Sequence, residues 1–326
     1  MRIATSVGTL ASLALLPLLA TPAWSDNWPS RPVMFIVPFA AGGGTDAFAR
    51  PLAAELDKQL GQRVLIENRA GAGGTAGAGI AAKSPPDGYT FLVGATHHAI
   101  APAVYPKLGY DLEKDFVPVA MIARPPHVVV VHPKVQVKTL DELIAQARAN
   151  PDKMNYASAG NGTAHHLAGE LFKLLTNTKI RHIPYRGAGP AMQDLVAGHV
   201  DMAFDGLGTS ATQINDGQIR GLAVAAPKRV QAFPNLPTAA EAGLKGYEVS
   251  TWYALWAPKG TPPDIVNRLI KEVQAALKQP AIKEAWERNG SDVPDVTGEE
   301  LGKFVSSEVA RWDKVVKDAG VKLDGP

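Results

Sequence analysis

Cysteine is absent from the 326-residue chain, and this absence removes several kinds of chemistry. Without thiols there can be no disulfide, no thiolate metal site and no cysteine nucleophile. The charge is also nearly balanced, with 33 basic against 31 acidic residues. A chain so close to neutrality lacks the basic surface that nucleic acids and anionic membranes select, so we expect neither as a partner.

Sequence motifs of the common enzyme classes are missing as well. There is no G-x-S-x-G, S-x-x-K or H-E-x-x-H, no Walker lysine after the glycines, and no G-x-G-x-x-G spacing. Histidine doublets occur at 97–98 and 165–166. Neighbouring residues on a helix point about 100° apart, so neither doublet chelates a metal by itself. We therefore expect no metal and no cofactor.

The first 25 residues have the features of an export signal. Arg2 is their only charge, a leucine-rich stretch covers residues 10–19, and the small residues Ala23 and Ser25 frame a cleavage site. The apolar stretch is too short and too interrupted by proline for a membrane anchor. We expect cleavage after Ser25 and a periplasmic mature protein, whose net charge would be +1 because 33 basic residues become 32 against 31 acidic ones.

The mature chain of about 300 residues is long enough for two domains. Apolar strands are predicted at 33–39, 63–68 and 90–95, with helical patterns between them. A second series opens at 127–133 and again alternates strands with helices. This alternation predicts an α/β fold of two lobes, each with a mixed, mostly parallel sheet flanked by helices.

In the first predicted helix, the apolar repeat favours a helix and an internal proline disfavours it. Apolar residues repeat every four positions from Phe48 to Leu60, which predicts a helix that ends at Gly61. Pro51 falls inside it and removes a backbone hydrogen bond. We therefore expect the first turns to bend or the helix to begin later.

The C-terminal part differs from the two series. Helices that begin at the capping signals 261–264 and 297–300 are expected to brace the lobes. Segments near 124–128 and 249–257 are expected to cross between the lobes as two hinges, where Trp252 and its aromatic neighbours favour core packing over a pocket wall. No low-complexity linker is present. We expect domain 1 to comprise residues 26–126 and 250–326, and domain 2 residues 127–249.

A glycine-rich loop follows the first predicted strand, with the sequence FAAGGGTD at 39–46. Glycines expose backbone N–H groups, and a helix start adds unpaired donors and a positive dipole end. The loop therefore suits a carboxylate, whereas Asp46 would repel a phosphate. The alternative is a tight turn in which Thr45 or Asp46 caps the helix.

A matching element occurs in the second series, where strand, glycines and a helix opening at Thr163 follow one another. Two facing helix starts would form a pincer for carboxylate groups. Ser158 and Asn161 would add short polar side chains, unless they are only turn residues. Arg186 and Asp205 end two further strands, and the carboxyl ends of strands in open α/β sheets meet at one crevice.

Selectivity is expected to come from the side chains around this crevice. The carboxylate of Asp205 would favour a ligand with an amino or hydroxyl donor and disfavour a second carboxylate in contact with it. The alternative for Asp205 is a turn residue at a strand end. Thr96 and His97, in the loop from Ala95 to His98, are further candidates for ligand contact.

Several segments of the chain resemble the Bug/TctC family, the extracytoplasmic solute receptors of tripartite tricarboxylate transporters. The resemblance covers almost the entire mature chain, and the segments occur in the family's order. They are WPSRPVMFIVPFAAGGGTDAFAR, VLIENRAGAGGTAGAGIAAKSPPDGYTFLVG, YDLEKDFVPVAMIA, NYASAGNGTAHHLAGELF, IPYRGAGPAMQDLVAGHVDMAFD and PNLPTAAEAG.

The resemblance implies a two-lobed periplasmic binding protein of the type II-like class that closes around a small carboxylate ligand. Loop backbone groups and ordered water would hold the ligand, and the receptor, acting as a monomer, would present it to membrane permease subunits. Arg186 stands where the family usually has lysine, which keeps the charge but makes the donor group planar. The implied arms are Phe39, Ala41, Gly42, Gly43, Thr45 and Asp46 on one side, and Ser158, Gly160, Asn161, Gly162 and Thr163 on the other.

Two other functions stay open at this point. A ligand sensor for a signalling partner would need the same closing lobes as a transport receptor. A periplasmic hydrolase could use a histidine from either doublet, but it lacks a recognisable nucleophile and base set.

Overall fold

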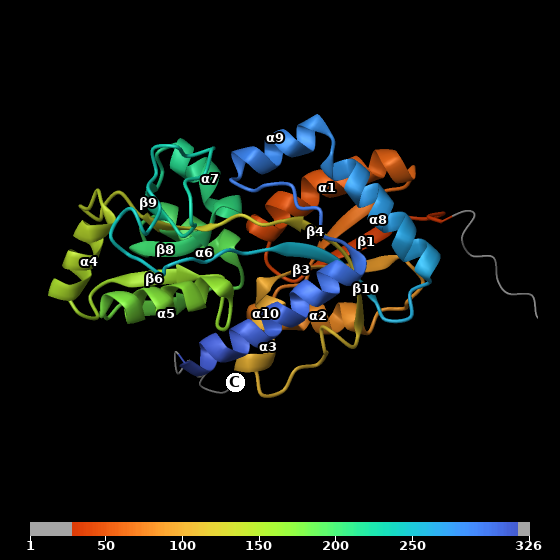
Figure 1. Ribbon diagram of the computed structural model, residues 1–326, viewed down its shortest axis with the longest axis horizontal. Coiled ribbons are helices and arrows are strands. Elements are labelled where there is room, and N and C mark those ends of the chain that lie inside the picture. Colours follow the sequence, from red (N-terminus) through yellow and green to blue (C-terminus); the bar gives the residue numbers. More distant parts are fainter. Residues whose placement is uncertain (1–27, 319–326) are drawn as a thin grey trace, which may run out of the picture.

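The computed structural model describes residues 28–318, which form two lobes built on separate five-stranded sheets (Figure 1). The predicted export signal, residues 1–25, lies outside the described residues. The first sheet has the order β2-β1-β3-β10-β4. Its strands are β1 (Val33–Val37), β2 (Val64–Asn68), β3 (Thr90–Ala95), β4 (Phe116–Ala123) and β10 (Tyr253–Pro258).

The second sheet repeats this arrangement with the order β7-β6-β8-β5-β9. In each sheet three neighbouring strands are parallel, and the next strand, β10 or β5, runs antiparallel to both of its neighbours. Both sheets are therefore mixed and mostly parallel. The strands of the second sheet are β5 (His127–Val131), β6 (Asn155–Ser158), β7 (Arg181–Pro184), β8 (Met202–Gly206) and β9 (Arg220–Val224).

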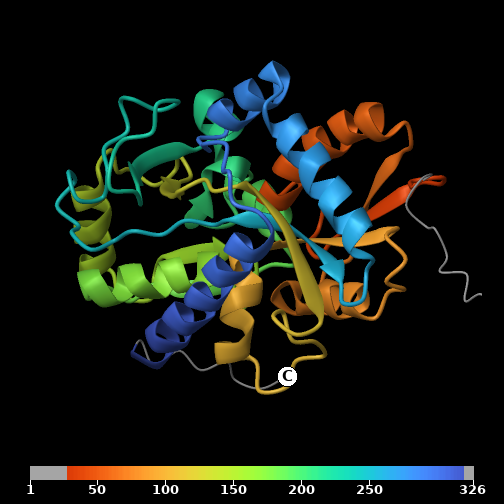
Figure 2. The same ribbon diagram turned by 45° about the vertical axis from the view of Figure 1, so that its right-hand side comes forward.

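Helices cover both faces of each sheet (Figures 1 and 2). The helices of the second lobe are α4 (Leu140–Ala149), α5 (Ala164–Thr176), α6 (Ala188–Val196) and α7 (Leu207–Asn215). Those of the first lobe are α1 (Gly44–Leu60), the 3-10 turn η1 (Ala72–Gly74), α2 (Thr75–Ala82), α3 (Thr96–Val104), α8 (Pro263–Leu277), α9 (Pro280–Arg288) and α10 (Gly298–Asp318). None of the helices within residues 28–318 has the length and apolar character of a membrane span.

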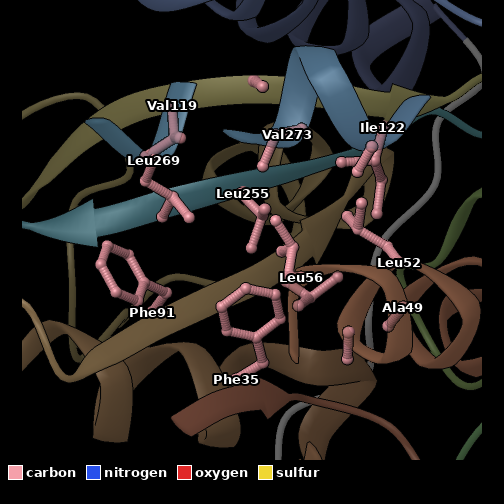
Figure 3. Close-up of a cluster of buried hydrophobic side chains, with 14 of the residues drawn as sticks. Phe35, Ala49, Leu52, Leu56, Phe91, Val119, Ile122, Leu255, Leu269 and Val273 are labelled. Atoms are coloured by element: carbon pink, nitrogen blue, oxygen red, sulfur yellow. The ribbon is translucent and has the colours of Figure 1, made fainter. Parts of the chain in front are cut away.

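The core of the first lobe lies between its sheet and the helices α1 and α8 (Figure 3). Leu52 and Leu56 of α1 meet Phe35 of β1 and Leu255 of β10 in this core, and all four are fully buried. The expected late start of the first helix is wrong, because α1 begins at Gly44 and continues through Pro51. Burial of its apolar face outweighs the single backbone hydrogen bond that proline removes.

Two chain segments pass between the lobes side by side. Pro126 and Ser250 form an antiparallel bridge, the His127 N–H donates to the Val249 carbonyl at 2.9 Å, and the Thr251 N–H donates to the Pro125 carbonyl at 3.2 Å. The second crossing leads directly into β10, which inserts between β3 and β4 of the first sheet. The domain boundaries at 126/127 and 249/250 stay a prediction.

Candidate ligand-binding site between the lobes

The loop between β1 and α1 touches the second lobe at the start of α6. The Ala40 N–H donates to the Arg186 carbonyl at 3.1 Å. A Cβ atom built on Gly43 would lie 3.2 Å from the Gly189 nitrogen, and one on Gly189 would lie 2.3 Å from the Ala41 carbonyl oxygen. The backbones of the two lobes are therefore in direct contact here, which is a closed arrangement that only glycine permits.

Asp46 braces this first loop with its buried carboxylate. Oδ2 accepts the Gly42 N–H at 2.8 Å and pairs with Arg50 at 3.1 Å, while Oδ1 accepts from the Asn68 amide at 3.1 Å. No side chain caps α1 at its N-cap residue Gly43. The expected capping by Thr45 or Asp46 is therefore wrong, and the N-terminus of α1 has no side-chain cap. Whether the loop binds a ligand or is only a tight turn stays a prediction.

The second loop, residues 158–163, is shaped by its own hydroxyl groups. Ser158 Oγ accepts the Gly160 N–H at 3.1 Å and lies 2.6 Å from His182 Nε2. Thr163 Oγ1 donates to the Gly160 carbonyl at 2.7 Å and accepts the His166 N–H at 3.4 Å, which caps α5. The backbone of Gly160 has a φ of 128°, a conformation that side chains disfavour.

Two hydrogen bonds join this second loop to the first lobe. His97 Nδ1 accepts the N–H of Ala164, the first residue of α5, at 2.9 Å. The Tyr105 hydroxyl donates to the Asn161 carbonyl at 2.7 Å. Burial, followed by the charges of neighbouring histidines, holds the pKa of His97 well below its usual 6.5, so the ring is a neutral acceptor.

Phe39 and the η1 turn form the wall beside this contact. The Phe39 ring stands edge-on to His97, with 5.0 Å between the ring centroids. A Cβ atom on Gly74 would lie 2.5 Å from the Phe39 ring, and one on Gly73 would lie 2.6 Å from the Asn161 carbonyl oxygen. Both glycines are therefore needed where η1 meets the ring and the opposite lobe.

Thr96 lies beside the second crossing, and its side chain forms a hydrogen bond there. Its N–H donates to the Trp252 carbonyl at 3.0 Å, and its Oγ1 accepts the Trp252 N–H at 2.8 Å. The Trp252 indole in turn donates to the buried carboxylate of Glu308 in α10 at 2.9 Å. The expected core packing of Trp252 and Trp256 is confirmed, since both are almost fully buried.

Asp205 lies within β8 and is buried, so it is not a turn residue at a strand end. Its Oδ2 accepts from the Ser210 hydroxyl at 2.5 Å, and its Oδ1 lies 3.1 Å from His165 Nε2. Burial, and after it the charge of Asp205, raises the pKa of Tyr253 above its usual value. The Tyr253 hydroxyl also reaches the first loop, because a Cβ atom on Gly44 would lie 2.2 Å from it.

Arg186 enters the junction only through its backbone carbonyl, and its side chain is exposed. The structure thus brings together both glycine loops, Phe39, His97 and Asp205. Residues 28–318 contain no group of three histidine or acidic side chains suited to a metal ion.

Sequence reasoning missed other members of the junction. Gly73, Tyr105, His165, Gly189 and Tyr253 all take part in it. Gly73 and Gly189 lie in segments that are rich in glycine in the sequence. Their contacts could not be predicted, because they depend on how the two lobes meet. His165 was visible as half of a doublet and was considered only as a metal ligand or as a catalytic histidine.

Comparisons with known proteins agree with this architecture. Residues 48–321 match the family model described as "Tripartite tricarboxylate transporter family receptor", TctC. Protein BugT from Bordetella pertussis is 39% identical over 307 residues, which cover 94% of each chain. Rpa4515 from R. palustris, solved with adipate, has a TM-score of 0.88 and 40% identity over 91% of this chain and 100% of its own.

A second solved structure, MatC from Rhodopseudomonas palustris with bound malate, has a TM-score of 0.85 and 38% identity over 89% of this chain and 100% of its own. These likenesses confirm the predicted two-lobed fold and the predicted family, and they remove the hydrolase that the histidine doublets left open. The chain belongs to the TctC family of tripartite tricarboxylate transporter receptors, which are periplasmic solute-binding proteins and not enzymes.

Proposed function

We propose that this receptor captures a small organic carboxylate between its lobes and delivers it, as a monomer, to the membrane permease of a tripartite tricarboxylate-type transporter. One observation carries the proposal: the N-termini of α1 and α5 open at the same interlobe junction, one without a side-chain cap and the other donating its first N–H across the junction. Relatives solved with adipate and with malate support a carboxylate ligand.

The two glycine loops would supply the main contacts. Backbone N–H groups at a helix start donate to an anion, and the helix dipole adds attraction without a charged side chain. The first loop would act through the backbone of residues 41–45, held in shape by Asp46, and the second through that of residues 160–163. Phe39 and His97 would form the wall, and Arg186 would add a positive charge at the rim.

Ligand capture would proceed by closure of the lobes about the two crossings. Contacts such as the hydrogen bond from Tyr105 to Asn161 exist only when the lobes meet. A ligand that bridges both loops binds the closed form better than the open one, so it shifts the equilibrium toward closure.

A thermal-shift screen of mono- and dicarboxylates, aromatic acids and amino acids tests this function. A ligand at 100 times its dissociation constant stabilises the folded protein by about 2.7 kcal/mol, which is readily detected as a raised melting temperature. Calorimetry on each hit should give one site per chain. If folded protein binds none of the carboxylates, the proposal fails.

Export through residues 1–25 is part of the same proposal, because a receptor of this kind works outside the cytoplasm. The mature protein should begin near Asp26. Mass spectrometry of native protein from the periplasmic fraction would show this terminus. An intact Met1 in the cytosolic fraction would contradict it.

A further inference from the structure

His165 is a buried histidine whose ring has no hydrogen-bond partner. It is the second residue of α5, its side chain is almost completely enclosed, and neither Nδ1 nor Nε2 makes a hydrogen bond within residues 28–318. An unsatisfied buried polar group is costly, so a native protein rarely keeps one without a reason. A group that binds only sometimes, such as a ligand, would supply that reason.

Three titratable side chains from other elements face this ring. His127 of β5 stacks on it with 5.0 Å between the centroids, and His97 of α3 lies at 5.4 Å. Asp205 of β8 brings its Oδ1 to 3.1 Å from Nε2, close enough for an ion pair but without hydrogen-bond alignment. Tyr253 of β10 stays neutral, since burial and after it the charge of Asp205 raise its pKa.

The three rings of the cluster differ in their hydrogen-bond partners. Burial lowers the pKa of both His97 and His127, and a charge on His165 lowers each of them further. His127 Nε2 is already engaged with the Thr251 hydroxyl at 2.6 Å, and His97 Nδ1 accepts from Ala164. Of the three rings, His165 is the one with a carboxylate beside it and with no hydrogen bond at either nitrogen, so Nδ1 can take a partner.

We propose that His165 binds the second acidic group of a dicarboxylate ligand through Nδ1. In the bound state Nε2–H faces Asp205, and Nδ1 carries a proton taken from solvent and donates it as a hydrogen bond to the ligand carboxylate. One imidazolium then lies between two carboxylates. The proton that is taken up offsets the negative charge that the ligand's second carboxylate brings to the cluster. The inference rests on the proposed function and names its ligand class.

The position of His165 suits this role. It directly follows Ala164, whose N–H donates across the junction to His97, so the imidazole lies beside the interlobe contact. A ligand that the first glycine loop holds by one carboxylate can meet this imidazole with the other. Asp205 then acts through His165 instead of touching the ligand, which makes it a positioning residue for dicarboxylates.

Calorimetry on three matched pairs of acids tests the proposal: succinate with butyrate, glutarate with pentanoate, and adipate with hexanoate. Wild type should bind at least one diacid about tenfold or more tighter than its monoacid partner, which corresponds to about 1.4 kcal/mol. His165→Phe keeps an aromatic ring between His97 and His127 but removes both nitrogens. It should reduce that ratio to about twofold or less, because the diacid loses more affinity than the monoacid does.

His199→Phe is the matched control. His199 is an exposed histidine that also faces a carboxylate, with 3.2 Å between its Nδ1 and Asp194 Oδ1, but it lies outside the junction. This variant should keep the wild-type ratio. If His165→Phe does not fold by circular dichroism, His165→Gln provides the same test, because it keeps a donor but cannot take up the charge.

Proton uptake gives a second readout that a merely structural role would not change. Titrations in two buffers of different ionisation enthalpy should show that wild type takes up a proton with the diacid and not with the monoacid. This uptake should disappear in His165→Phe. Asp205→Asn should weaken the diacid relative to the monoacid, whereas a gain for the diacid would mean direct repulsion by Asp205 and would overturn the proposal.

The outcomes separate this inference from the proposed function. If no acid binds to folded wild type, both fail. If acids bind but the ratio survives in His165→Phe, or if no diacid binds more tightly than its monoacid, only the role of His165 fails and the carboxylate receptor stands.

Discussion

Gly43→Val changes a close backbone contact between the two lobes. Gly43 has φ −89° and ψ 178°, an extended conformation that valine readily adopts, so the variant carries no backbone strain. Its Cβ atom would lie 3.2 Å from the Gly189 nitrogen and 3.5 Å from the Ala188 Cβ, both across the junction. The two methyl groups of valine extend beyond that Cβ, so they force the lobes apart.

The magnitude follows from overpacking. Side-chain atoms inserted into a filled contact cost about 1–3 kcal/mol, and here the cost falls only on the closed form. Ligand affinity should therefore drop by about 5- to 150-fold, since each 1.4 kcal/mol is tenfold. Gly43→Ala adds only the Cβ atom and should give a smaller loss. The open form does not contain the contact, so its stability should stay the same.

Calorimetry measures the affinity, and small-angle X-ray scattering shows whether saturating ligand still makes the protein more compact. Gly79→Val in α2 is the matched control, because a Cβ atom there meets no atom within 4 Å. Its affinity should equal that of wild type. Unchanged affinity in well-folded Gly43→Val would refute the reasoning and leave the first glycine loop as a simple turn.

Two further predictions concern the histidines and the outer contact of the junction. Burial lowers the pKa of His98 to about 4, so the unfolded chain binds a proton below pH 6.5 that the folded protein does not. The contribution of His98 to the free energy of unfolding is therefore fully present above pH 6.5, and it is lost as the pH falls toward 4. At pH 5.5 His98 alone should cost about 1.4 kcal/mol, and equal urea midpoints at pH 7.5 and 5.5 would contradict this. Tyr105→Phe removes the 2.7 Å hydrogen bond to Asn161 and should weaken ligand binding by about 2- to 10-fold in calorimetry, whereas an unchanged dissociation constant would show that the bond does not favour closure.

The sequence predicted the fold where local patterns were strong. The four-residue repeat of α1 and the apolar strands of both series are local signals, and their positions agree with the structure within a few residues. Helix α3 was missed because it is buried on nearly all sides and contains Pro102, so it shows no amphipathic period. Tertiary packing, not local pattern, stabilises it.

The candidate site likewise has a part that local sequence predicts and a part that it does not. The loops at 42–46 and 158–163 were predicted because glycines before a helix have a local physical meaning. Contacts that join the two lobes, such as that of Tyr105 with Asn161 56 positions away, depend on how one lobe is placed against the other. No local pattern contains that information. The ligand roles of these residues stay a prediction.

The insertion of β10 between β3 and β4 has a consequence for how the chain folds. Residues 124–252 separate β4 from β10 along the chain, and the second sheet contains only strands from within that stretch. The second lobe can therefore form from one continuous segment, whereas β3 and β4 have no neighbour that joins them until β10 arrives. Contacts over such a separation form slowly. The first sheet thus waits for the C-terminal part of the chain, so the first lobe should reach its native state after the second one.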